Sequence, residues 1–219
     1  MHIVLCLPFI STICQSLICM LNVIVNKVKG FLLNPVETFQ QSRDDEPGVV
    51  FAYFGALLLI SAILSAIVAA IGVEIMPGYA GMMGGVAMPI AVFFMVLVGG
   101  FIFTLIFAAW LHLWVYLLGG RKGIMQTFKA IIYGHTPRLL LGWIPIVGFI
   151  FALWSLVLGI LGIRELQEMS TGKAILAVVI AVMIPLIVFI LLAAWFFISY
   201  ATINGIPVPP GNAFPTAVN

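Results

Sequence analysis

A 33-residue stretch without a charged side chain, Val86 to Leu118, constrains the fold of this chain more than any other feature. It ends at a basic turn, Arg121 and Lys122, after which apolar sequence resumes at Ile124. Apolar runs longer than about 18 residues are typical of membrane spans, because the bilayer core takes about 20 helical residues to cross. Hydrophobic residues make up 64% of the sequence and charged residues 7%, whereas about a quarter of the residues in soluble domains are charged. The sequence therefore predicts an all-α membrane protein.

Five apolar segments of helical length follow residue 48. The second exceeds the thickness of the bilayer core, so we expect it to tilt, to protrude, or to kink near Pro89 or Gly99-Gly100. The third contains Pro137, which has no backbone N–H and crowds the carbonyl of Tyr133, so we expect a kink or break there. The sequence thus predicts a polytopic helical bundle with five transmembrane helices over residues 49–200. The expected spans are Val49–Val73, Val86–Leu118, Ile124–Leu141, Ile146–Ile163 and Ala174–Tyr200.

The segment before the first span, residues 21–48, has the pattern of amphipathic helices on the cytoplasmic side. Apolar residues recur at helical spacing from Leu21 to Leu32. This helix is too short to cross a bilayer, so we expect it in the headgroup plane with Phe31 on its membrane face. Asn34 is expected to cap a second helix that begins at Pro35. The sequence therefore predicts an N-terminal interfacial amphipathic helix.

The two ends of the chain differ in composition from this core. Residues 1–20 form an apolar extension for which two readings stay open: translation that starts at Met20, or a short interfacial or pairing helix. Its three cysteines, at positions 6, 14 and 19, fit neither a zinc site nor a CxxC pair. Residues 201–219 contain four prolines and no charged side chain, which predicts an extended external tail.

The distribution of basic residues predicts the orientation in the membrane. With five spans, Arg138 is alone among the nine Lys and Arg residues in lying towards the far side. The positive-inside rule then places the N-terminus in the cytoplasm and the C-terminus outside, in a multi-pass protein of the cell membrane. The residues on the cytoplasmic side are Lys27, Lys29, Arg43, Arg121, Lys122, Lys129, Arg164 and Lys173.

Few residues inside the expected spans are candidates for carrying chemistry. His112 lies in the second span, and Tyr133, His135 and Pro137 lie in the third. Because these two spans form a hairpin, we expect one polar cluster that is structural by default and functional if hydrated, with His112 as a candidate donor to the carbonyl freed by Pro137. Two histidines without a third ligand make a poor metal site, so no metal or cofactor is expected.

The outer end of the first span offers one acidic residue, Glu74, for Arg138 of the third. Either the two form an ion pair or each faces lipid headgroups and water separately. No Asp or Glu lies within the expected spans, and no Walker loop, HExxH or nucleophile elbow is present. We therefore expect no catalytic residues and no enzymatic activity.

Several short motifs are spread along the chain between about Leu21 and Tyr200. They are Asn34-Pro35, Thr38-Phe39, Leu118-Gly119-Gly120, Tyr133-Gly134-His135-Thr136-Pro137, Ile144-Pro145, Trp154 and Ser170-Thr171-Gly172-Lys173-Ala174. Together they resemble the Yip (Ypt/Rab-interacting) family of five-span membrane proteins, in its prokaryotic form, and the resemblance implies an integral membrane protein. Eukaryotic relatives are associated with Rab GTPases and typically carry a DLYGP-type element, which is missing here and puts small-GTPase binding in doubt.

These features leave two functions open. The first is a non-enzymatic membrane scaffold or membrane-organising protein, indicated by short amphipathic helices, tight turns and small residues at helix faces. The alternative is a small transporter or channel subunit with the polar cluster between its second and third spans. The expected partners are the lipid bilayer and either further copies of the chain or other membrane proteins. A net charge of +2 with scattered basic residues argues against nucleic acid.

Overall fold

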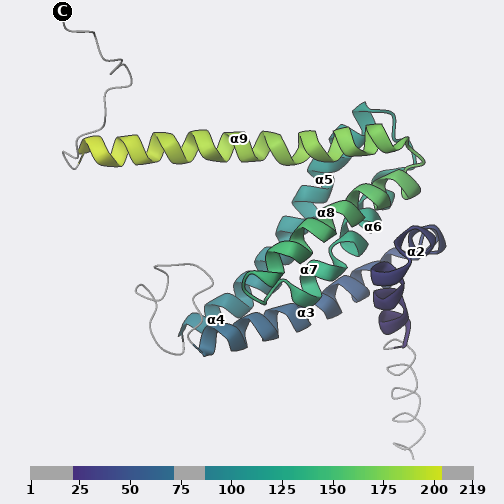
Figure 1. Ribbon diagram of the computed structural model, residues 1–219, viewed down its shortest axis with the longest axis horizontal. Coiled ribbons are helices and arrows are strands. Elements are labelled where there is room, and N and C mark those ends of the chain that lie inside the picture. Colours follow the sequence, from purple (N-terminus) through teal and green to yellow (C-terminus); the bar gives the residue numbers. More distant parts are fainter. Residues whose placement is uncertain (1–21, 72–86, 204–219) are drawn as a thin grey trace, which may run out of the picture. The chain divides into compact units, whose positions relative to one another are not determined.

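The computed structural model describes residues 22–71 and 87–203, and this part of the chain is helical without strands (Figure 1). It divides into two compact units, Met1–Val178 and Val179–Asn219. The N-terminal helix covers residues 22–33. The elements after it are α2 (Pro35–Gln41), α3 (Pro47–Ala70), α4 (Ala87–Phe94), a π-helix η1 (Met95–Gly99), α5 (Gly100–Leu117), α6 (Ile124–Gly134), α7 (Thr136–Leu141), α8 (Val147–Leu166) and α9 (Thr171–Ile203).

Four helical stretches are long and apolar enough to cross a membrane: Pro47–Ala70, Ala87–Leu117, Val147–Leu166 and Thr171–Tyr200. Their outward side chains are large and apolar, as in Phe103, which is 64% exposed. Such a surface would be unfavourable in water and is suited to lipid. The all-helical, multi-pass membrane architecture expected from the sequence is therefore present, with four candidate spans in the described residues.

The second candidate span is irregular where the sequence predicted it. The backbone forms one π-helical turn, η1, immediately before Gly100. A side chain at Gly100 would crowd α3, because a Cβ atom there would lie 3.1 Å from Cδ1 of Leu58. The π turn and the glycine together let this long helix stay close to α3.

The third apolar segment is broken at His135, between α6 and α7, as Pro137 predicted. Both pieces pack on α8. The backbones of α6 and α8 nearly touch, since a Cβ atom at Gly134 would lie 3.0 Å from Cα of Gly159. Because Ala130–Gly134, Thr136 and Pro137 are buried inside the protein, irregular backbone is tolerated at this depth.

The segment before α3 differs from its prediction at Phe31 and at Asn34. Phe31, expected on the membrane face, has no exposed surface and packs into the bundle instead. Asn34 makes no side-chain capping bond; the hydroxyl of Thr38 donates to the Asn34 carbonyl. Phe31 is buried because its ring contacts Phe39 and Tyr133. These aromatic contacts stabilise the ring more than partial immersion in lipid would.

Several predictions concern residues outside the described ranges. These are the N-terminal extension, residues 1–20, the candidate ion-pair residue Glu74, and the tail from residue 204. The first part of the expected tail, residues 201–203, belongs to α9 instead.

Candidate functional site

Four buried aromatic residues form a cluster that joins the N-terminal helix, α2, α3 and α6. Phe31 stacks on Tyr133 with 4.7 Å between ring centroids and lies 4.9 Å from Phe39. Tyr53 meets Tyr133 edge-on at 5.3 Å. All four residues are at most 2% exposed. Each ring buries a large apolar area and favours tilted or offset contacts, so this aromatic cluster anchors the N-terminal helix to the bundle.

Hydrogen bonds link Tyr53 of the aromatic cluster through Thr136 to the backbone of Tyr133. Pro137 leaves the carbonyl of Tyr133 without its usual i+4 partner. The hydroxyl of Thr136 donates to that carbonyl at 2.7 Å, so the Thr136 oxygen accepts from the Tyr53 hydroxyl at 2.8 Å. The sequence suggested His112 as a donor to this carbonyl, but the donor in the structure is Thr136, which is closer along the chain and already faces inward.

Thr136→Val is expected to lower the free energy of unfolding by about 1–3 kcal/mol, because it leaves a buried carbonyl and a buried phenol without partners. Adding Pro137→Ala to this variant restores an N–H four residues after Tyr133 and should recover part of the loss. Denaturant unfolding in detergent measures both. Equal stability of Thr136→Val and the natural chain would refute the role of this hydroxyl.

Asp45 binds the polar groups next to the aromatic cluster. Its Oδ2 accepts from Lys27 Nζ at 2.5 Å and from the hydroxyl of Tyr133. Lys27 also donates to Ser42 Oγ at 2.9 Å and lies over the Tyr133 ring, 4.9 Å from its centroid. The Lys27 and Asp45 side chains are only 15% and 19% exposed. This partly buried pair therefore orders the loop before α3 as well as the N-terminal helix.

The same loop is bound to α6 and α8 through Arg43. Its backbone carbonyl accepts from Lys129 Nζ at 2.5 Å and Gln126 Nε2 at 3.1 Å, and Lys129 is 4% exposed. Its guanidinium donates to Glu168 at 2.6 Å and to the carbonyl of Glu165 at 2.7 Å. The ammonium group of buried Lys129 thus donates to a carbonyl oxygen, with acidic residues of the loop close by. Side chains of α6 and the end of α8 therefore both hold the loop before α3.

His112 belongs to a separate polar group at the α5–α6 turn. Its Nδ1 lies 2.8 Å from Thr127 Oγ1, and Gln167 Nε2 donates to the same oxygen at 3.0 Å. Gln167 also bonds to the Gly123 carbonyl at 2.8 Å and accepts from the Lys122 N–H at 3.0 Å. This network joins the ends of α5, α6 and α8.

The residues predicted to form one polar cluster therefore have different partners. The Tyr133 hydroxyl bonds to Asp45, and Nδ1 of His135 lies 2.8 Å from the carbonyl of Ile131. The exposed Arg138 bonds through its backbone N–H to Ser155 at 3.0 Å. A single hydrated cluster that includes His112 stays a prediction.

Sequence reasoning missed the roles of Lys27, Asp45 and Thr136. The first two lie in segments whose polar residues usually face water, and spacing alone does not separate a paired charge from a solvated one. Thr136 carried a usable signal, because a hydroxyl directly before a proline can reach the carbonyl that the proline frees.

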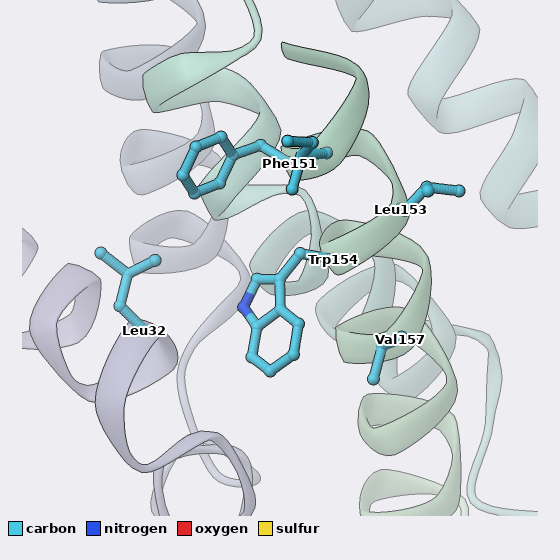
Figure 2. A pocket seen from close by; sticks show the side chains of 6 residues that line it. Leu32, Phe151, Leu153, Trp154 and Val157 are labelled. Atoms are coloured by element: carbon cyan, nitrogen blue, oxygen red, sulfur yellow. The ribbon is translucent and has the colours of Figure 1, made fainter. Parts of the chain in front are cut away.

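An apolar groove lies between the N-terminal helix and α8 (Figure 2). Its volume is about 490 Å³. Trp154, 43% exposed, lies across from Leu32 in this view. The lining is apolar apart from the indole N–H of Trp154, so the groove suits lipid chains. The residues around it are Leu32, Ile150, Phe151, Leu153, Trp154 and Val157.

One comparison with known proteins supports the family resemblance seen in the sequence motifs. No curated protein and no solved structure matches the chain. The model of the Yip1 domain family matches residues 29–206, which include the aromatic cluster and all four candidate spans. The chain therefore belongs to the Yip1 domain family of membrane proteins.

Proposed function

We propose that this protein is a non-enzymatic membrane scaffold, which presents a fixed surface at one membrane boundary to other membrane proteins or to further copies of itself. The observation that carries the proposal is the double attachment of the segment before α3. The N-terminal helix is anchored by the aromatic cluster and by Lys27–Asp45, and the following loop by Lys129 and the Arg43 contacts. A surface ordered in advance loses little conformational entropy when a partner binds.

A small transporter or channel subunit is the second candidate. It is favoured by the polar group of His112, Thr127 and Gln167 between the second and third apolar segments. Transport sites commonly combine polar side chains with broken helices. Against it, these three side chains bond to one another, and the protein also satisfies the carbonyl freed by Pro137.

We propose five crossings of the cell membrane, with a cytoplasmic N-terminus and an external C-terminus. The α6–α7 pair, residues 124–141, supports the extra crossing: at roughly 1.5 Å per residue it reaches about 27 Å. Charge placement supports the orientation. Reporter fusions after Leu33, Gly120 and Gln167 are expected to read cytoplasmic, and fusions after Gly81 and Asn212 external. A cytoplasmic C-terminus would contradict this topology.

Flux measurements separate the two functions. The purified chain is reconstituted into vesicles loaded with potassium, protons or a small fluorescent anion. A scaffold should leave each leak rate equal to that of protein-free vesicles. Cross-linking in cells from cysteines introduced at exposed sites of α2 should then give defined products, which disappear when the N-terminal helix is released by Phe31→Ala. Selective flux that His112→Phe abolishes would overturn the scaffold proposal.

A further inference from the structure

The turn between α5 and α6, residues 118–123, carries positive charge that the fold does not neutralise. The Arg121 guanidinium carbon lies 3.9 Å from the centroid of the Tyr116 ring. Lys173 of α9 reaches the same turn, since its Nζ would be 3.7 Å from a Cβ atom at Gly119. Within the described residues, neither cation takes part in a salt bridge.

The other cation of this turn, Lys122, is already paired. Lys122 Nζ lies 2.5 Å from Glu168 Oε2, and the other carboxylate oxygen binds Arg43 at 2.6 Å. The hydrogen bond from Lys122 and the nearby Arg43 charge hold the pKa of Glu168 below its ordinary value, so this carboxylate stays ionised. Lys122 is therefore a natural comparison for Arg121, because both cations lie in the same turn and only Lys122 has an acidic partner within the described residues.

The turn is held in one conformation. Gly119 adopts φ +103°, which favours glycine, and the Gly120 N–H donates to the Val115 carbonyl at 2.8 Å. Gln167 binds the far end of the turn through Gly123 and Lys122. The backbone that carries Arg121 is consequently ordered before any ligand arrives, which lowers the entropic cost of binding.

The surface beside the cations is apolar. Leu113, Tyr116 and Leu117 are 46%, 50% and 63% exposed at the end of the candidate span Ala87–Leu117. A ligand that satisfies both parts needs a negative group at the turn and hydrocarbon along the last turns of α5. That combination describes an anionic phospholipid, whose headgroup lies where a span leaves the bilayer.

We propose that Arg121 and Lys173 form a binding site for the headgroup of an anionic phospholipid, whose acyl chains lie against Leu113 and Leu117. Stacking on Tyr116 uses the face of the guanidinium and leaves its N–H edge for two phosphate oxygens. Lys173 adds a second charge from another helix. The site requires only that the chain spans a membrane, so it is independent of the scaffold proposal.

The test is native mass spectrometry of the full chain in detergent, titrated with phosphatidylglycerol and with phosphatidylcholine of the same acyl chains. Each cation near a membrane surface contributes roughly fivefold to the affinity for anionic lipid. Arg121→Gln with Lys173→Gln should weaken phosphatidylglycerol binding by at least about tenfold and leave phosphatidylcholine binding unchanged. Unchanged phosphatidylglycerol binding would overturn the proposal.

Lys122→Gln is the control for a single charge, because it removes one positive charge from the turn that carries Arg121. It should change phosphatidylglycerol binding by less than about twofold, since the Lys122 ammonium is held against Glu168 rather than towards the proposed site. A loss as large as that of the double variant would mean unspecific attraction and would also overturn the site. If the double variant does not fold, Lys173→Gln alone gives the same test, with a loss of about fivefold expected.

Discussion

Gly162→Ala is expected to lower the free energy of unfolding by about 1–3 kcal/mol, although alanine is the better helix former. Gly162 of α8 is enclosed between α2 and α6. A Cβ atom there would lie 2.8 Å from Cε1 of Phe39 and 3.0 Å from Cα of Ala130. The Phe39 ring is fully buried in the aromatic cluster, so relief of the clash must move the cluster or the α6 backbone.

Gly159→Ala is the control for this prediction, one turn earlier on the same helix. A Cβ atom there would meet only Cδ1 of Ile131, at 3.8 Å, which is an ordinary contact. This variant should keep or gain up to about 1 kcal/mol from helix propensity. Denaturant unfolding in one detergent compares the two. Equal effects of both substitutions would show that α6 and α8 do not approach as closely as described.

Phe31→Ala is expected to release the N-terminal helix from the bundle. The ring has no exposed surface and contacts Tyr133, Phe39 and Tyr53, so its loss should cost about 3–5 kcal/mol. This cost falls on docking of the helix, because the long helices of the bundle keep their own contacts. Limited proteolysis in detergent or vesicles should therefore cut before α3 at least ten times faster, with an intact membrane domain as the product.

Leu33→Ala provides the comparison, since this residue of the same helix is 76% exposed. It should leave the cleavage rate unchanged, because little area is lost from the protein interior. If Phe31→Ala were cut no faster than the natural chain, the N-terminal helix would be held by Lys27 and Asp45 rather than by aromatic packing. Asp45→Asn in the Phe31→Ala background would then identify that contribution.

The long apolar helices were predictable because a helix that crosses the bilayer core needs a continuous apolar stretch of sufficient length. Apolar length gave their approximate bounds, and glycine and proline gave the irregular points at Gly100 and Pro137. Each of these signals acts on the local backbone, so a single sequence contains it.

The contacts around the candidate site could not be predicted in the same way. The partners Lys27 and Tyr133, or Tyr53 and Thr136, are far apart along the chain and meet only because the N-terminal helix, α3, α6 and α7 pack together. Helical periodicity placed Phe31 on an apolar face, yet periodicity is the same for a face against lipid and a face against protein. The difference lies in the tertiary packing, where a stacked tyrosine replaces lipid.

The loop before α3 has one consequence for how the protein can change in sequence. Lys129 and Gln126 bind the carbonyl of residue 43 and make no demand on its side chain. Every amino acid offers that oxygen. A substitution at position 43 therefore removes the guanidinium contacts to Glu165 and Glu168 but leaves the loop attached to α6 through its backbone.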